Sequence, residues 1–111
     1  MTADKRVRFM RLVLFFDLPV GTAKQRKDYR LFRKSLMKDG FLPLQESVYA
    51  KLVVNDAAAD SAVARVRKYR PPVGLVQILK VTENQFSTMD YITGSRSDYE
   101  EIDTMDELLV L

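Results

Sequence analysis

The spacing of apolar residues changes along the chain from strand-like to helix-like and back. Residues 8–17 form a nearly continuous run of Val, Leu and Phe that is closed by a Pro-containing turn, which predicts a central strand buried on both faces. Thr22 and Gln25 have capping-box spacing, and no Gly or Pro interrupts the following segment before Gly40. This pattern predicts a helix that ends at Asp39.

The second half of the chain repeats the alternation. Residues 41–54 are rich in strand formers but are interrupted by Pro43 and by the polar residues 45–47, which predicts two strands or one sharply bent strand. We favour a short strand followed by a longer one. Asn55 or Asp56 can cap a second helix that Pro71 ends, with Val63 and Val66 facing inward. Further strands are then predicted at residues 73–81, 86–92 and 108–111.

The predicted order β-α-β-β-α-β is that of a ferredoxin-like α+β sandwich, in which two helices cover one face of an antiparallel sheet. We assign residues 1–94 to this domain and residues 95–111 to an acidic tail that ends in a short added strand. Residues 9–16 are apolar at both odd and even positions, which indicates that the other sheet face is also buried. A second copy of the chain is the simplest partner that could bury it. The sequence thus predicts a homodimer packed through its sheets, with 108–111 pairing on a sheet edge of the neighbouring protomer.

Charge is divided unequally along the chain. Residues 1–82 contain 17 Lys or Arg against 7 Asp or Glu, a net charge of +10, whereas residues 83–111 contain one Arg against 8 acidic residues, a net charge of −7. A basic body of this kind indicates a polyanionic partner such as nucleic acid. The acidic segment 98–107 either is a solvated linker or rests on the basic body and competes with DNA.

The composition excludes most familiar enzyme chemistries. The chain has no Cys and no His, which removes disulfides, thiolate nucleophiles, the usual zinc sites and the commonest general base. Two kinds of catalytic chemistry remain: carboxylates that hold a hard cation such as Mg²⁺, and a Ser/Lys arrangement. The longest apolar run is too short for a membrane span and the basic start lacks a signal-peptide apolar stretch, so we expect a cytoplasmic protein without membrane contact.

Asp17 is the first candidate for a functional residue. It ends the predicted first strand, and the rim of a sheet is a common place for ligands and metals. One carboxylate is a poor Mg²⁺ site, but a symmetric dimer could bring two copies of Asp17 together. The alternative is that Asp17 only accepts backbone hydrogen bonds in the turn.

Basic residues gather on the first predicted helix. Lys27, Arg30 and Lys34 fall on one face at i, i+3, i+7 spacing, and such a stripe can follow phosphates, whereas a merely solvated face usually alternates in sign. The predicted DNA-binding residues are Lys24, Arg26, Lys27, Arg30, Arg33 and Lys34. A secondary set lies near the end of the second helix, where the helix dipole favours cations in any case: Arg65, Arg67, Lys68 and Arg70.

Four segments, in this order, resemble the CRISPR-associated protein two family. They are FFDLP around Asp17, the basic helix RKDYRLFRKSLMKDGF, QESVY at residues 45–49 and VTENQF at residues 81–86. The resemblance covers nearly all of residues 9–94. The LVLFFDLPV start and the long basic helix look closest to the members that accompany type II-A systems.

The resemblance implies a homodimer that bridges two dimers of the CRISPR integrase and holds the protospacer duplex by its phosphates during insertion into the CRISPR repeat. Our leading hypothesis is this non-catalytic scaffold of spacer acquisition. The alternative is a Mg²⁺-dependent endonuclease acting on DNA or RNA, because some members have been assigned such activity with a first-strand aspartate, matched here by Asp17, as metal ligand. Many relatives carry further acidic residues just after that aspartate. This chain has the sequence LPVG there, at residues 18–21, which contains no acidic residue. A ferredoxin-like module that senses a small molecule ranks last, since no Gly-rich phosphate loop is present.

Overall fold

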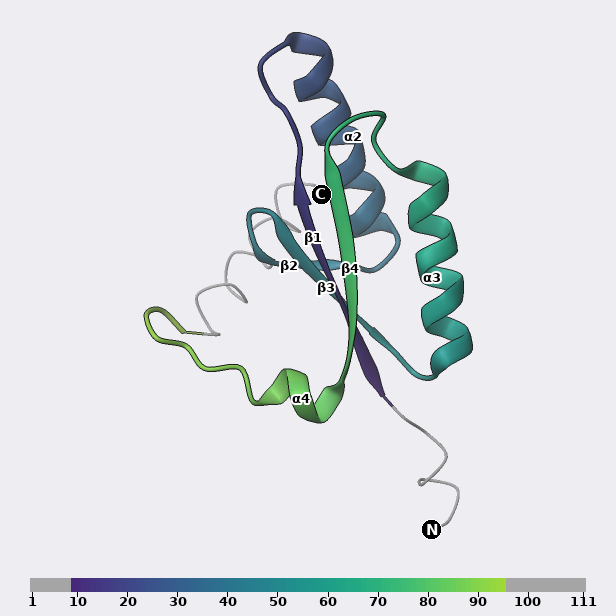
Figure 1. Ribbon diagram of the computed structural model, residues 1–111, viewed down its shortest axis with the longest axis vertical. Helices are drawn as coiled ribbons and strands as arrows, with labels where there is room; N and C mark the ends of the chain where they lie inside the picture. Colours follow the sequence, from purple (N-terminus) through teal and green to yellow (C-terminus); the bar gives the residue numbers. More distant parts are fainter. Residues whose placement is uncertain (1–8, 96–111) are drawn as a thin grey trace.

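The computed structural model describes residues 9–95, in which strands and helices alternate in the predicted β-α-β-β-α-β order (Figure 1). The ferredoxin-like α+β fold is therefore confirmed. The predicted strand at residues 108–111 lies outside the described residues. The elements are β1 (Met10–Asp17), α2 (Ala23–Lys38), β2 (Leu42–Gln45), β3 (Val48–Val53), α3 (Asp56–Tyr69), β4 (Leu75–Thr82) and α4 (Glu83–Ser87).

The four strands form one antiparallel sheet in the order β2-β3-β1-β4. β1 is central, and Leu14 lies opposite Tyr49 of β3 on one side and Ile78 of β4 on the other. A register shift between Pro43 and Gln45 interrupts the pairing of β2 with β3, as the proline in this segment predicts. β2 and β4 are the edge strands of the described sheet.

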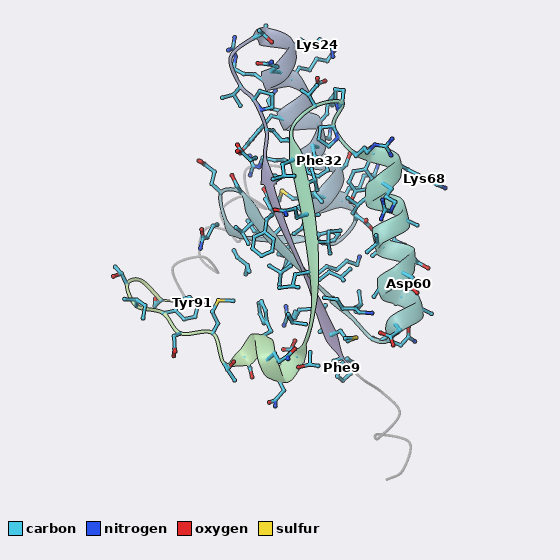
Figure 2. All side chains as sticks on the ribbon, viewed as in Figure 1. Phe9, Lys24, Phe32, Asp60, Lys68 and Tyr91 are labelled. Atoms are coloured by element: carbon cyan, nitrogen blue, oxygen red, sulfur yellow. The ribbon has the colours of Figure 1, made fainter. Side chains whose placement is uncertain are left out.

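The hydrophobic core lies between the sheet and the two long helices. Leu12, Leu14 and Phe16 alternate along β1 toward this side and are buried. The ring centroids of Phe16 and Phe32 are 5.5 Å apart, and Figure 2 shows Phe32 on α2 beside the sheet. The core also contains Leu36, Phe41, Tyr49, Val53, Ala59, Ala62 and Val66, so α2 and α3 cover the same sheet face.

Helix caps fix the ends of α2 and α3 as the sequence predicts. The Thr22 hydroxyl accepts a hydrogen bond from the Gln25 N–H at 3.1 Å, and the Gln25 side chain accepts one from the Thr22 N–H at 3.0 Å. Gly40 follows α2 with a φ of 96°, a conformation that glycine adopts without a Cβ penalty. The Asn55 side chain caps α3 by accepting from the Ala58 N–H at 2.7 Å. The predicted start residues are therefore confirmed.

The opposite sheet face is open in a single copy of the chain. Phe15 on β1 is 37% exposed and Leu79 on β4 is 54% exposed, although both are large apolar residues. Val13, on the same side of β1, is buried, so within one copy the prediction that both faces of the first strand are buried holds on the helix side and only in part on the opposite side. Covering the open face requires a further element or a second molecule.

The prediction of a turn followed by a strand at residues 86–92 is wrong. Glu83–Ser87 is a short helix, α4, and no strand occurs in residues 88–95. Thr82 and Gln85 form a capping box of the same kind as the one that starts α2. The capping pattern at this point therefore outweighed the strand propensity of the aromatic and branched residues that follow.

Asp39 joins α2, α3 and β3 behind the core. Its carboxylate accepts from the Arg65 Nε at 2.8 Å and from the Tyr69 hydroxyl at 3.0 Å, and Lys51 donates to its backbone carbonyl. Burial, together with the hydrogen bond to Asp39, raises the pKa of Tyr69 above its ordinary value. The end of the first helix is thus fixed by charges from two other elements.

Candidate nucleic-acid interface and rim carboxylate

Asp17 lies at the rim of the sheet, at the end of β1, where it pairs with Leu75 of β4. Its side chain is exposed and makes no hydrogen bond or ion pair with any residue in the range 9–95. The alternative interpretation, in which the carboxylate accepts backbone hydrogen bonds in the following turn, finds no such contact within that range. Asp17 is therefore free to meet a ligand from solvent.

Gly74 holds the rim closely against the loop that precedes β4. A Cβ atom placed on Gly74 would lie 2.6 Å from Leu18 Cδ2 and 2.8 Å from the Asp17 backbone oxygen. Gly74 also has a φ of 106°, which side chains rarely tolerate. The loop between α3 and β4 thus fixes the backbone of Asp17, a role that the sequence alone did not indicate.

The rim of one copy offers too few ligands for magnesium. The β2–β3 turn approaches from the other side, where the Phe16 N–H donates to the Ser47 carbonyl at 3.0 Å. However, no group of three or more acidic side chains gathers anywhere in the described part of the chain. Mg²⁺ prefers six oxygen ligands, so Asp17 of one copy does not by itself fit such an ion.

Four exposed cations form a stripe along α2, which we call the α2 stripe. Lys27, Arg30, Lys34 and Lys38 follow i, i+3, i+7, i+11 spacing, and the stripe lies opposite Phe32, which faces the core. None of the four pairs with another residue of the described chain. At the helical rise, the stripe extends for about 16 Å. Lys38 was not among the predicted DNA-binding residues, although its spacing from Lys34 could have identified it.

The other predicted residues of α2 are already engaged within the chain. Lys24 pairs with Asp28 at 3.1 Å near the start of the helix, where Figure 2 labels it, and Arg26 donates to the Val20 carbonyl at 3.1 Å. Arg33 donates from Nε to the Tyr49 hydroxyl at 2.7 Å. The structure therefore separates the predicted set into three stripe residues and three residues with local partners.

The secondary basic set divides in the same way. Arg65 is bound to Asp39, and Arg70 donates to the Arg67 carbonyl at 2.9 Å. Arg67 and Lys68 are exposed on α3 and have no such partner in residues 9–95, and Figure 2 shows Lys68 toward the end of this helix. This end of α3 is the second cationic surface of the chain.

Three side chains join the start of β1 to the start of α4, a contact that was not predicted from the sequence. They are Arg11, Glu83 and Phe86, and we call this contact the clasp. Arg11 binds both oxygens of Glu83, with Nε to Oε1 at 2.6 Å and Nη2 to Oε2 at 3.1 Å. The same guanidinium lies 4.6 Å from the ring centroid of Phe86. The clasp sets the direction in which the chain leaves the sheet, because it fixes α4 immediately after β4.

Comparison of the sequence with known proteins identifies relatives of this chain. The family model described as CRISPR associated protein Cas2 matches residues 10–89. A protein from Treponema denticola is 48% identical over 103 residues, which cover 92% of this chain and 100% of the relative. A Streptococcus mutans protein is 46% identical over 78% of this chain and 80% of its own length, and one from Ligilactobacillus salivarius is 42% identical over 78% and 86%. All three are named CRISPR-associated endoribonuclease Cas2. The chain therefore belongs to the CRISPR-associated Cas2 family.

Proposed function

We propose that this protein is a non-catalytic, dimeric scaffold of CRISPR spacer acquisition, which holds duplex DNA by its phosphates in the cytoplasm and bridges dimers of the integrase. The family membership supports a CRISPR role. The observation that carries the proposal is the α2 stripe, because it offers cations that no other part of the described chain uses.

The α2 stripe suits contact with a nucleic-acid backbone without base readout. Its cations repeat at each helical turn, and each is exposed and unneutralised within residues 9–95. Such contacts position a duplex but carry no sequence information. A scaffold that accepts spacers of any sequence needs this kind of contact.

The open sheet face supports dimerisation. Its exposed apolar residues are contributed by all four strands, and a surface of this kind is costly to leave in water. A second copy placed face to face would bury it and would present two α2 stripes on one assembly. The open-face residues are Phe15, Leu42, Leu52, Leu75 and Leu79.

Duplex binding by a charge-neutralised variant tests the proposal. Lys27→Gln, Arg30→Gln and Lys34→Gln together remove three positive charges from the stripe. We expect weaker binding of a protospacer-length duplex and a shallower dependence of log affinity on log salt, by about 2.7 units for three lost phosphate contacts.

A matched variant separates the stripe from net charge. Val54→Glu, Ala57→Glu and Asn84→Asp change the net charge by the same amount at exposed positions outside the α2 stripe and the end of α3. Their salt slope should stay at the wild-type value. Equal losses in both variants, or wild-type binding by the stripe variant, would remove the main support for the scaffold.

A metal-dependent endonuclease that pairs Asp17 across the dimer is the second candidate. The names of the relatives favour it, and the free carboxylate at the rim is compatible with it. It predicts RNA or DNA cleavage that disappears with EDTA and in Asp17→Ala. The scaffold predicts the opposite pattern, in which spacer acquisition in cells survives Asp17→Ala.

A further inference from the structure

A groove with an apolar floor and a basic rim runs between α3 and the edge strand β4, which Figure 1 shows next to each other. The groove is open because α3 packs against β1 and β3, the strands on the inner side of β4. It encloses about 320 Å³. The floor contains Leu12, Val63, Val66, Val76 and Ile78, and the charged rim contains Asp60, Arg67, Arg70 and Lys80.

The two ends of the groove differ in charge. Toward the start of α3, Lys80 pairs with Asp56 at 3.1 Å, and Asp60 adds a further carboxylate to the rim. Toward the end of α3, Arg67 has no carboxylate partner among the described residues, and Arg70 donates to a backbone carbonyl. The groove is therefore cationic only at the end of α3.

The cationic end continues into a second hollow of about 560 Å³. Arg67 and Arg70 line both spaces, and Lys68, Pro71 and Pro72 complete the second one. None of the residues in the range 9–95 that line this second hollow is acidic. An occupant of the groove would thus meet apolar surface on both sides of the two guanidinium groups.

The apolar floor distinguishes this site from the α2 stripe. Contact with phosphates requires cations, but a nucleic-acid backbone gains nothing from an apolar floor. Apolar side chains of a protein do gain from it, at about 25 cal/mol for each Å² removed from water. Carboxylates, in turn, accept charge-assisted hydrogen bonds from guanidinium groups. The groove therefore suits a protein segment that is both apolar and acidic.

The groove lies on the helix side of the sheet, not on the open face. Val76 and Ile78 of its floor pair with Phe16 and Leu14 of β1, which are buried in the core under the helices. A second copy on the open face leaves this side uncovered. A strand added to the edge of β4 lies in the plane of the sheet, so it leaves the side chains of the floor in place.

This position favours a helical occupant. A segment that lies on side chains has no neighbouring strand to pair with, so its backbone N–H and C=O groups must be satisfied within the segment itself, as they are in an α-helix. The groove follows α3 from Ala59 to Arg70, a length of about 16 Å at the helical rise. A helix of about three turns matches this length.

We infer that the groove between α3 and β4 binds a short amphipathic helix of a partner protein. The apolar stripe of this helix packs on Val63, Val76 and Ile78, and the carboxylates at one of its ends bind Arg67 and Arg70. The opposite end carries no acidic residue, because it meets the carboxylate end of the groove. This site goes beyond the scaffold function proposed above, since it requires neither duplex binding nor the α2 stripe.

Binding of designed peptides to the full chain tests this inference. The probe is a fluorescent, acetylated peptide of about three helical turns, with a stripe of leucines along it and glutamates beside the stripe at one end. One control peptide has serine in place of each leucine, and the other has lysine in place of each glutamate. By fluorescence anisotropy at low ionic strength, we expect the probe to bind at least about tenfold more tightly than either control.

Matched variants assign the binding to the groove. Arg67→Gln with Arg70→Gln should weaken probe binding at least about tenfold. Lys24→Gln with Arg26→Gln removes the same charge at exposed positions of α2 and should bind the probe as the wild type does. Circular dichroism checks that both variants are folded. Equal losses in both variants, equal affinity for all three peptides or no binding of the probe would overturn the inference.

A disulfide reports the direction of the bound helix. Because the chain has no native cysteine, Asp60→Cys supplies a single thiol at the carboxylate end of the groove. A probe with cysteine at the end opposite its glutamates should react at least about tenfold faster than a probe with cysteine at the glutamate end. Equal rates or the reverse order would overturn the pairing of the glutamates with Arg67 and Arg70.

Two other occupants of the groove give different results. If nucleic acid filled it, an excess of duplex would displace the probe. If a second copy filled it, the probe would dissociate the dimer, which sedimentation detects as a fall in mass. Either result would overturn the inference. A chain that binds the probe but no duplex would refute the proposed scaffold and would leave the partner site supported.

Discussion

Arg11 and Glu83 are separated by 72 positions in the chain and form a bidentate ion pair, with Nε–Oε1 at 2.6 Å and Nη2–Oε2 at 3.1 Å. The Glu83 N–H also donates to the Phe9 carbonyl at 3.1 Å. The start of α4 is thereby fixed to the start of β1. Every residue after β4 leaves the sheet from this point.

Replacing Glu83 by Gln should loosen the clasp. The substitution keeps the shape of the side chain but removes its charge, so we expect a loss of about 1 kcal/mol in the free energy of unfolding. Urea denaturation measures this loss. Phe86→Leu in both backgrounds completes a double-mutant cycle, and additive effects would show that the ring and the ion pair act independently.

Asp39→Asn should destabilise the fold more than any other loss of a surface charge. The side chain of Asp39 is only 11% exposed, and its loss of charge leaves Arg65 and Lys51 without their shared carboxylate. We expect about 2–4 kcal/mol by chemical denaturation. Asp28→Asn is the matched control, because Asp28 pairs only with the exposed Lys24, and it should cost less than about 0.5 kcal/mol. Similar losses for both variants would contradict the special role of Asp39.

Tyr69 should make stability fall at alkaline pH. Burial and the bond to Asp39 raise the pKa of Tyr69 in the folded state, so the folded chain binds the phenol proton more tightly than the unfolded chain does. The stabilisation is fully present below the unfolded pKa, about 10, and is lost as the pH rises above it. The wild type should therefore be more stable than Tyr69→Phe at pH 8, and this difference in the free energy of unfolding should be smaller above pH 10. A constant difference at all pH values would show that the phenol does not titrate with unfolding.

Gly74→Ala should disturb the rim at Asp17. The new Cβ meets the Asp17 backbone oxygen and Leu18, and the φ of 106° disfavours any side chain, so we expect a loss of about 1–3 kcal/mol. Gly21→Ala is the control, because its Cβ would make only an ordinary contact of 3.4 Å with the Gln25 side chain. Thermal unfolding of both variants measures the difference. Equal melting temperatures would show that the loop adapts.

Local patterns determined most of the elements. The capping box at Thr22, the Asn55 cap and the glycine at position 40 depend on neighbouring residues, so the sequence predicts them well. The same rule applied to Thr82 and Gln85 would have predicted α4 instead of a turn and strand. That error arose because apolar composition was weighted above a cap of the same kind.

The sequence by itself determined the fold class, the basic body, the position of Asp17 at the end of β1 and the face of α2 that carries Lys27, Arg30 and Lys34. Only the tertiary structure decided which cations remain free. Three arginines are instead bound to side chains that lie between 16 and 72 positions away along the chain: Arg33 to Tyr49, Arg65 to Asp39 and Arg11 to Glu83. Helical periodicity reports the side of an element on which a charge lies, but its partner depends on which other elements the fold brings against that side.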